Sequence, residues 1–286
     1  MTFAAAVCAV IGCASQQGEA LRPQLKARKA TSVAEWEGGE ARLRDATMRM
    51  GIILPDGADA TGFPIKLRAP GEEQKESFEF IKDGGAGDRT RIGAGVPITA
   101  DGYFLTAKHC LGARTPAVFL YDRKTEKVIK SVAQVVWTSD DEADLALLRT
   151  SHRISEPFDL ADVQTASKGD RVGATGWSGL GEGGVFDGMG AGRIRAIEER
   201  RNRGRVWYEV EHDAPIHPGD SGGPLIDARG RLVGIHSGGK VGAISIYRPK
   251  PEGAPLRGFQ AISNLPDASW LMGEIEADRG RAAASR

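Results

Sequence analysis

The sequence predicts an all-β fold of the barrel or sandwich class. Glycine supplies 38 of the 286 residues, a clear excess over the usual share of about 7%. Apolar runs are short and follow one another closely, with glycine-bearing turns between them. Many short strands joined by such turns are typical of all-β barrels and sandwiches.

The first elements lie in a polar N-terminal third. Residues 14–45 carry mixed charges and predict a linker with one short helix over residues 33–43. The first strand is expected over residues 47–54, closed by a Pro-Asp-Gly turn. Residues 58–90 are polar and glycine-bearing, apart from a predicted strand over residues 77–81.

From residue 91 the strand pattern is regular. Strands over residues 91–98 and 103–106 flank a turn that ends at Gly102. Further strands are expected over residues 118–122, 128–137, 144–148, 171–176, 192–198, 205–211, 225–226, 232–235 and 259–263. The chain ends in a predicted short helix over residues 268–276 and a loose tail rich in Arg and Ala.

Charge and motif content exclude several function classes. The 38 basic and 38 acidic residues give a net charge of zero, whereas nucleic-acid binding and membrane-surface binding normally require a basic surplus. The sequence contains no metal-ligand cluster, phosphate-binding Walker loop or dinucleotide fingerprint. We therefore expect no metal, no cofactor and no nucleic-acid partner.

The N-terminus resembles an export signal. Residues 3–11 form an apolar run that is too short to span a bilayer, which takes about 20 residues. Residues 10–13 resemble a bacterial lipoprotein cleavage box, in which Cys13 would be lipidated and would tether the protein to a membrane. No Lys or Arg precedes the run, so a frayed apolar tail is the alternative. We expect an exported protein of the periplasm or cell envelope.

The other cysteines predict no disulfide. Cys8 and Cys13 lie near the N-terminus, and if that segment is removed or modified, Cys110 has no cysteine with which to form a disulfide. A free cysteine usually behaves as a small buried apolar residue. A nucleophilic role for Cys110 beside His109 is less favoured, because adjacent side chains on a strand point apart.

The sequence Pro-Gly-Asp-Ser-Gly-Gly-Pro at residues 218–224 surrounds one hydroxyl with turn residues. Glycines allow positive φ and close approach of another chain. Such a loop can expose Ser221 and direct the amides of Gly219 and Ser221 at one point, where an oxyanion would sit during acyl transfer. The hairpin predicted over residues 225–235 anchors this loop to a sheet.

A serine hydroxyl needs a base and a group that orients the base. Of the five histidines, His109 is best placed, because it ends an apolar strand and begins a turn of small residues. The orienting carboxylate is expected to be Asp144, which directly precedes the apolar strand at residues 145–148. A carboxylate at the mouth of a buried strand needs a partner, and a histidine N–H would supply one.

The order His109, Asp144, Ser221 is that of the double-barrel serine proteases. Three motifs carry a resemblance to the trypsin/chymotrypsin superfamily: Leu-Thr-Ala-Lys-His-Cys at 105–110, Asp-Leu-Ala-Leu-Leu at 144–148 and Gly-Asp-Ser-Gly-Gly-Pro at 219–224. The chain is most similar to the bacterial Deg-type (high-temperature-requirement) proteases and glutamyl endopeptidases. The resemblance covers about residues 47–276.

The resemblance implies two six-stranded antiparallel barrels with the triad in the crevice between them. It places the first barrel within residues 46–158 and the second barrel with the C-terminal helix within 159–277, after a signal at 1–13 and a linker at 14–45 and before a tail at 278–286. His109 would act as general base and then acid, Asp144 would orient it, and Ser221 would form an acyl-enzyme. The amides of Gly219 and Ser221 would hold the oxyanion.

Specificity is expected to depart from that of trypsin. Trypsin-like enzymes that cleave after Lys or Arg carry an acid six residues before the serine, where this chain has Pro215. The expected pocket residues are Ile216, Pro218, His236, Ser237 and Gly238. Ile216 favours small apolar side chains, whereas the sequence around His236 resembles glutamyl endopeptidases, in which the matching histidine binds an acidic side chain. The alternative for His236 is a hydrogen-bonded core histidine.

The function predicted from these residues is that of a serine endopeptidase acting on proteins or peptides. A catalytically inactive barrel pair that serves as a binding module is the first alternative, and an esterase or transferase with the same triad is the second. The charged run at residues 198–205 is interpreted as a solvated hairpin tip rather than a partner site. No pattern in the sequence predicts an oligomeric state.

Overall fold

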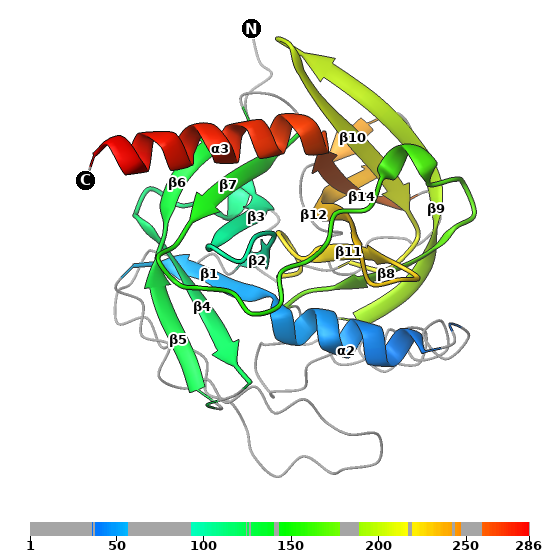
Figure 1. Cartoon of the computed structure of the whole chain (residues 1–286). Helices are drawn as coiled ribbons and strands as arrows, with labels where there is room; N and C mark the ends of the chain where they lie inside the picture. The colour runs from blue at the N-terminus through cyan, green and yellow to red at the C-terminus, as the bar shows by residue number, and fades with distance from the viewer. Residues whose placement is uncertain are drawn as a thin grey trace, which may run out of the picture.

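The computed structural model shows two curled β-sheets packed side by side, with one helix lying along each outer side (Figure 1). It describes residues 36, 38–56, 93–123, 125, 127–139, 143–177, 189–216, 219–241, 244–246 and 259–285. The predicted export signal, Cys13 and the predicted strand over residues 77–81 lie outside these ranges.

The first sheet has the strand order β5-β4-β1-β2-β3-β7-β6, and all its pairings are antiparallel. Its strands are β1 (Gly51–Pro55), β2 (Gly93–Pro97), β3 (Tyr103–Ala107), β4 (Pro116–Asp122), β5 (Lys127–Val132), β6 (Gln134–Thr138) and β7 (Leu145–Arg149). A short 3-10 helix, η1 (Lys108–Cys110), follows β3.

The two ends of this order, β5 and β6, were predicted as one strand over residues 128–137. They are separated by Ala133 alone, whose amide donates to the carbonyl of Pro116 at the end of the β4–β5 ladder, before the chain turns to pair with β7. The single strand therefore bends at Ala133 and contributes to both edges, so that the sheet curls back on itself. This is why seven named strands occupy the six expected positions.

The second sheet has the order β11-β8-β9-β10-β14-β12-β13. Its strands are β8 (Arg171–Thr175), β9 (Met189–Asn202), β10 (Arg205–His212), β11 (Pro224–Asp227), β12 (Leu232–Val241), β13 (Ile244–Ile246) and β14 (Phe259–Pro266). An additional pairing between β11 and β12 closes six of these strands into a barrel, and β13 extends β12. The predicted all-β fold of two barrel-like sheets with a C-terminal helix is confirmed.

Helix α2 (Gly39–Arg49) replaces the start of the first predicted strand. The helix was expected over residues 33–43 and the strand over 47–54, but Thr47 is buried inside the helix and the strand begins at Gly51. Leu43 and Trp36 pack against the position of Gly173 in β8, where a side chain would overlap them. Docking on the second sheet thus accompanies a helix that continues six residues past its predicted end at residue 43.

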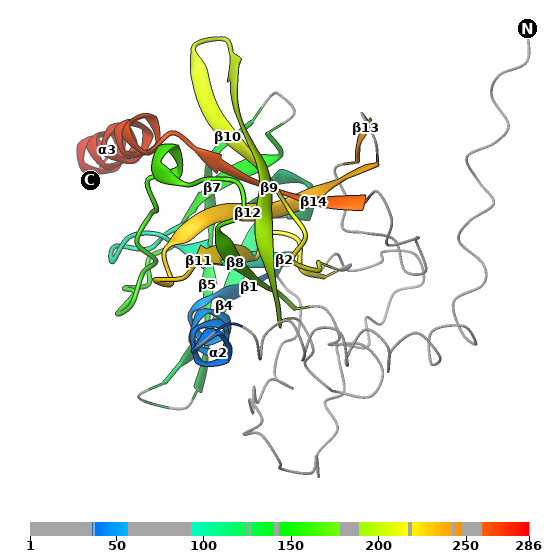
Figure 2. The same ribbon diagram turned by 90° about the vertical axis from the view of Figure 1, so that its right-hand side faces the viewer.

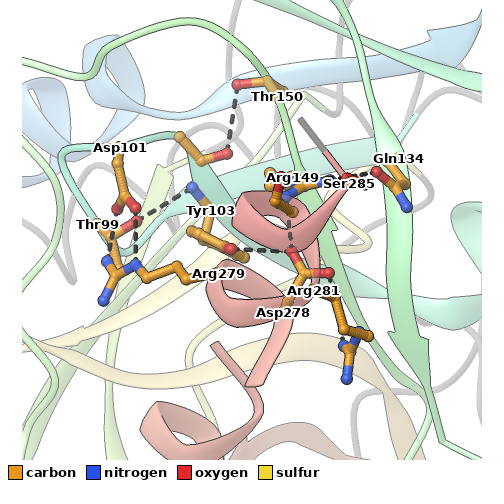
Figure 3. Close-up of polar contacts among 12 residues, drawn as sticks. Thr99, Asp101, Tyr103, Gln134, Arg149, Thr150, Asp278, Arg279, Arg281 and Ser285 are labelled. Atoms are coloured by element: carbon orange, nitrogen blue, oxygen red, sulfur yellow. Dashed lines mark hydrogen bonds and ion pairs between the residues drawn. The ribbon is translucent and has the colours of Figure 1, made fainter. Parts of the chain in front are cut away.

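Helix α3 (Ala268–Ala284) begins after β14 of the second sheet and crosses over β6 and β7 of the first (Figure 1). Its predicted end at residue 276 and the predicted loose tail are wrong, because the added turns carry a buried carboxylate, Asp278. Asp278 accepts from the hydroxyl of Tyr103 at 2.9 Å and pairs with Arg149 at 3.2 Å (Figure 3). Arg279 pairs with Asp101 at 2.8 Å. Among the described residues, no helix is long and apolar enough to cross a membrane.

Strands β9 and β10 form a long hairpin that projects beyond the barrels (Figure 2). Its tip is a turn at Arg203 and Gly204, both with positive φ. Glu198 and Arg200 form an ion pair at 2.6 Å with both side chains partly exposed. The charged run at residues 198–205 is therefore mostly strand, rather than the loop that was expected, and four of its charges form two ion pairs within it, Glu198–Arg200 and Glu199–Arg201.

The contact between Tyr103 and Asp278 predicts a stability change at high pH. Burial, together with the Asp278 carboxylate, raises the pKa of Tyr103 from 10.0 to about 12. The unfolded chain therefore releases the phenolic proton at lower pH than the folded chain. This contribution is complete below pH 10.0 and is lost as the pH rises to about 12, and two pH units correspond to at most about 2–3 kcal/mol.

We expect the free energy of unfolding of the wild type, measured by urea denaturation, to fall more steeply than that of Tyr103→Phe across this window. The phenylalanine variant keeps the apolar ring and cannot titrate, so the difference between the two curves isolates the hydroxyl. Parallel curves would show that Tyr103 has no raised pKa in the folded state.

Candidate active site

The strand β3 delivers His109 to the boundary between the two sheets. Residues 103–107 of β3 are all buried, and the chain then turns into η1, so His109 leaves the core at the strand's end. Its side chain is about one quarter exposed, at 28%. The ring is thus held by a rigid strand but open on one side, as a group that exchanges protons with a bound molecule requires.

Asp144 lies under this ring at the start of β7. Its Oδ2 is 2.6 Å from His109 Nδ1, and its Oδ1 accepts the backbone N–H of His109 at 3.0 Å. Because a carboxylate can only accept, Nδ1 of His109 carries the proton and Nε2 of the neutral ring is left as an acceptor. The carboxylate therefore sets both the tautomer and the plane of the imidazole.

The backbone at Asp144 is in the left-handed region, with φ of 49°. Aspartate tolerates this conformation better than most residues, but it still costs about 1–2 kcal/mol. The amide of Lys108 donates to the carbonyl of Asp144 at 2.9 Å, which helps to hold it. Strain of this kind persists only where the surroundings fix the residue.

Ser221 comes from the second sheet, in the loop at residues 219–223 before β11. Its Oγ is 2.8 Å from His109 Nε2. The carbonyl of Ser221 accepts from the amide of Ala94 in β2 at 2.7 Å, so the loop is bonded directly to the first sheet. The structure thus brings His109, Asp144 and Ser221 into one continuous chain of hydrogen bonds across the two sheets.

Glycines let the serine loop approach β2 this closely. Gly219 and Gly222 have φ of 99° and 79°, values that other residues rarely adopt. A Cβ on Gly222 would overlap the carbonyl oxygen of Ala94 and would also meet Thr106 Oγ1 at 2.6 Å. Thr106 in turn donates to that same carbonyl at 2.7 Å.

The two amides predicted to form the oxyanion hole are those of Gly219 and Ser221. Within the described ranges, neither N–H donates a hydrogen bond to another protein group. Ser221 is only 4% exposed, and buried backbone N–H groups are normally paired. Unengaged donors beside the Ser221 hydroxyl can stabilise an anion that forms there.

The predicted pocket residues lie in different surroundings. Ile216 is buried in the core of the second barrel, and Pro218 lies outside the described residues. Gly238 lies at an irregularity in the pairing of β12 with β14. Ser237, in contrast, donates to Asp144 Oδ2 at 2.8 Å, so its hydroxyl contacts the carboxylate rather than lining a pocket.

His236 is fully buried behind the serine loop. Its Nδ1 is 2.9 Å from the hydroxyl of Ser263, which is also 3.0 Å from Nε2 of His212. The ring lies against Gly223, since a Cβ there would be 3.2 Å from His236 Cδ2. Burial, followed by the neighbouring His236, lowers the pKa of His212 well below its usual value, so this imidazole is neutral.

The remaining predicted residues are placed as follows. Cys110 is buried beside Gly93 and forms no disulfide with another described residue, and Asp220 is buried within the serine loop. Within the described part of the chain, no group of three or more His, Cys, Asp or Glu side chains could hold a metal ion.

Three contacts of this site have no local sequence signal. Ser237 was assigned to the pocket, Ser263 was treated only as a strand end, and Asn264 was not singled out. Asn264 donates to the carbonyl of Ala143 at 2.7 Å, from 121 residues away along the chain. Only the register between β12 and β14 brings Ser263 and Asn264 to this place.

Comparison with known proteins gives one family and consistent relatives. Residues 93–235, half of the chain, match the trypsin-like peptidase domain. The serine protease Do-like HtrB of Bacillus subtilis is 36% identical over 141 residues, covering 47% of this chain and 29% of that protein. A probable periplasmic serine endoprotease, DegP-like, of Pseudomonas savastanoi is 32% identical over 196 residues, covering 64% of this chain and 39% of that protein.

Solved structures show the same fold. An HtrA-type protease, AlgW, with a decapeptide aligns with a TM-score of 0.51 and 24% identity, covering 82% of this chain and 66% of that one. The active form of the Rv3671c protease from M. tuberculosis aligns with a TM-score of 0.50 and 20% identity, covering 85% of each chain. This chain spans less than two fifths of the length of the two curated relatives.

The serine loop gives a prediction with a matched control. Gly222 and Gly230 share a φ of 79°, but nothing lies within 4 Å of a Cβ added at Gly230. Gly230→Ala should cost only the left-handed conformation, about 1–2 kcal/mol. Gly222→Ala adds the overlap with Ala94 and should cost about 3 kcal/mol or more. Equal losses in urea denaturation would mean that the loop does not dock on β2.

Proposed function

Because the chain belongs to the family of trypsin-like peptidase domains, we propose that it is a serine endopeptidase that hydrolyses peptide bonds through His109, Asp144 and Ser221. The observation that carries the proposal is the chain of two hydrogen bonds, 2.6 Å from Asp144 to His109 and 2.8 Å from His109 to Ser221. The second distance lies within the range in which a general base acts on its nucleophile, and the first within the range in which a third group orients the base.

The first step follows from the tautomer of His109. Nε2 accepts the proton of Ser221 as Oγ attacks the scissile carbonyl, and a tetrahedral oxyanion forms. The imidazolium is stabilised by Asp144, whose Oδ2 already accepts from Nδ1. His109 then gives its proton to the leaving amine, and the acyl group remains on Ser221 as an ester.

The second step mirrors the first. Water attacks the ester, His109 takes its proton, and Ser221 Oγ leaves with the proton returned. In both tetrahedral states the oxyanion would accept from the amides of Gly219 and Ser221. One donor of this kind is worth about 3–4 kcal/mol of transition-state stabilisation in enzymes in which it has been removed.

The substrates that we propose are proteins or peptides of the cell envelope. Two observations support them: the curated relative in Pseudomonas savastanoi is named as periplasmic, and AlgW was solved with a decapeptide. A tether through lipidated Cys13 remains part of the proposal and would keep the enzyme at a membrane surface.

Labelling with a fluorophosphonate tests the nucleophile. We expect one adduct per chain by intact mass on the wild type and none on Ser221→Ala, and turnover of a casein substrate should fall by about 10⁴-fold or more in the variant. A folded wild type that takes no label would instead favour the binding-module alternative. Ester hydrolysis without casein hydrolysis would favour the esterase.

Cleavage specificity is a separate prediction. Pro215 lies where an acid would be needed to pair with Lys or Arg, so we expect a peptide library to be cleaved after small apolar or acidic residues. His236→Gln separates these two classes. The variant should lose cleavage after Glu and Asp at least 10-fold more than cleavage after Ala if His236 contacts an acidic side chain. Cleavage mainly after Lys or Arg would contradict both classes.

A further inference from the structure

We infer that Asn264 is a positioning residue for Asp144, an inference that rests on the proposed function. Asn264 lies on β14 of the second barrel and is fully buried. Its Nδ2 donates to the carbonyl of Ala143 at 2.7 Å, the residue directly before Asp144 in the first barrel. The side chain of Asn264, in the second barrel, thus holds the peptide group between Ala143 and Asp144 in the first barrel.

This contact bears directly on the conformation of Asp144. The angle φ of Asp144 describes rotation between its own carbonyl and that of Ala143 about the N–Cα bond. The carbonyl of Asp144 is held by the amide of Lys108 at 2.9 Å, and that of Ala143 is held by Asn264. With both carbonyls fixed, φ remains at its strained value of 49°.

Rotation about φ would move the carboxylate away from the histidine. The two carboxylate oxygens accept three hydrogen bonds: two from His109, at 2.6 Å and 3.0 Å, and one from Ser237 at 2.8 Å. These bonds require the Cβ of Asp144 to point under the imidazole. Ser237 holds the carboxylate itself, and Asn264 holds the backbone from which the carboxylate projects.

The cost of burying Asn264 supports this role. Among the described residues, no hydrogen-bond donor reaches its Oδ1. A buried acceptor without a partner costs about 1–3 kcal/mol, a cost that an apolar side chain of similar size would avoid. Exchanging Oδ1 and Nδ2 would set one oxygen against another at Ala143, so the amide can only lie this way round. The hydrogen bond from Nδ2 to the Ala143 carbonyl is the contact that offsets this cost.

The neighbouring strand residue serves a different contact. Side chains alternate along β14, and Ser263 bonds to His212 and His236 inside the second barrel while Asn264 points toward the first. A change at Asn264 therefore leaves the histidine pair in place. This separation allows the effect on Asp144 to be measured by itself.

The test compares Asn264→Leu with Leu265→Ala. Leucine fills a similar volume but cannot donate to Ala143. Leu265 is buried on the same strand in the apolar core, so its truncation weakens packing without removing a polar contact. We expect Leu265→Ala to lower the melting temperature at least as much as Asn264→Leu and to leave kcat within about twofold, since its cost is confined to packing.

For Asn264→Leu we expect kcat to fall about 10- to 100-fold with KM changed less than about twofold, because a small misplacement of a catalytic group has effects of this size. The acid limb of the pH profile of kcat/KM should move to lower pH, since a displaced carboxylate stabilises the imidazolium less. Unchanged kcat and an unchanged acid limb in an active wild-type background would overturn the inference.

A second variant tests the same role if Asn264→Leu does not fold. Asn264→Asp keeps the shape of the side chain, and its carboxyl can donate to Ala143 only when protonated. Its rate relative to the wild type should therefore rise as the pH falls. A constant ratio across the pH range would count against the role of the donor.

A spectroscopic measurement separates this inference from the proposed function. The NMR resonance of the His109 Nδ1 proton reports its bond to Asp144 whether or not the protein turns over substrate. If the wild type takes no fluorophosphonate label but Asn264→Leu broadens or shifts this resonance, the endopeptidase proposal fails and the positioning role stands. If the resonance is the same in both proteins, the positioning role fails.

Discussion

The site depends on the close approach of the serine loop to strand β2. The bond from the Ala94 amide to the Ser221 carbonyl joins the backbone of the second barrel to that of the first. Thr106 bonds to the other polar group of Ala94, and Gly222 has no side chain to keep the strands apart. With that contact, the hydroxyl of one barrel reaches the imidazole of the other.

Asp144 is also held by contacts between the two barrels. It belongs to the first sheet in sequence, yet Ser237 and Asn264 of the second sheet fix its carboxylate and its preceding peptide. A shift between the two barrels would therefore disturb all of these contacts together. Hydrogen-bonded networks of this kind are cooperative, and their members cannot be valued one by one.

The sequence predicted the parts of this arrangement that depend on local chemistry. Glycines around Ser221, an aspartate at the mouth of an apolar strand and a histidine at a strand end are each visible in a few residues. The contacts of Ser237, Ser263 and Asn264 were not predictable, because they depend on the register of β12 and β14 and on barrel-to-barrel packing. The two helices were misjudged for the same reason: α2 and α3 run past their predicted ends, where Thr47 and Asp278 make tertiary contacts that propensity does not contain.

The course of α3 has a consequence for how the molecule assembles. Tyr103 and Asp278 are 175 positions apart in the sequence, and Asp101 and Arg279 are 178 positions apart. During synthesis the first barrel must therefore remain with part of its polar face uncovered while the whole second barrel emerges from the ribosome. Contacts of such long sequence separation slow folding, because the chain between them has to be ordered first. His109 and Ser221 lie on opposite sides of this delay, so a nascent chain carries the histidine and Asp144 long before the serine that completes their hydrogen-bond chain is synthesised.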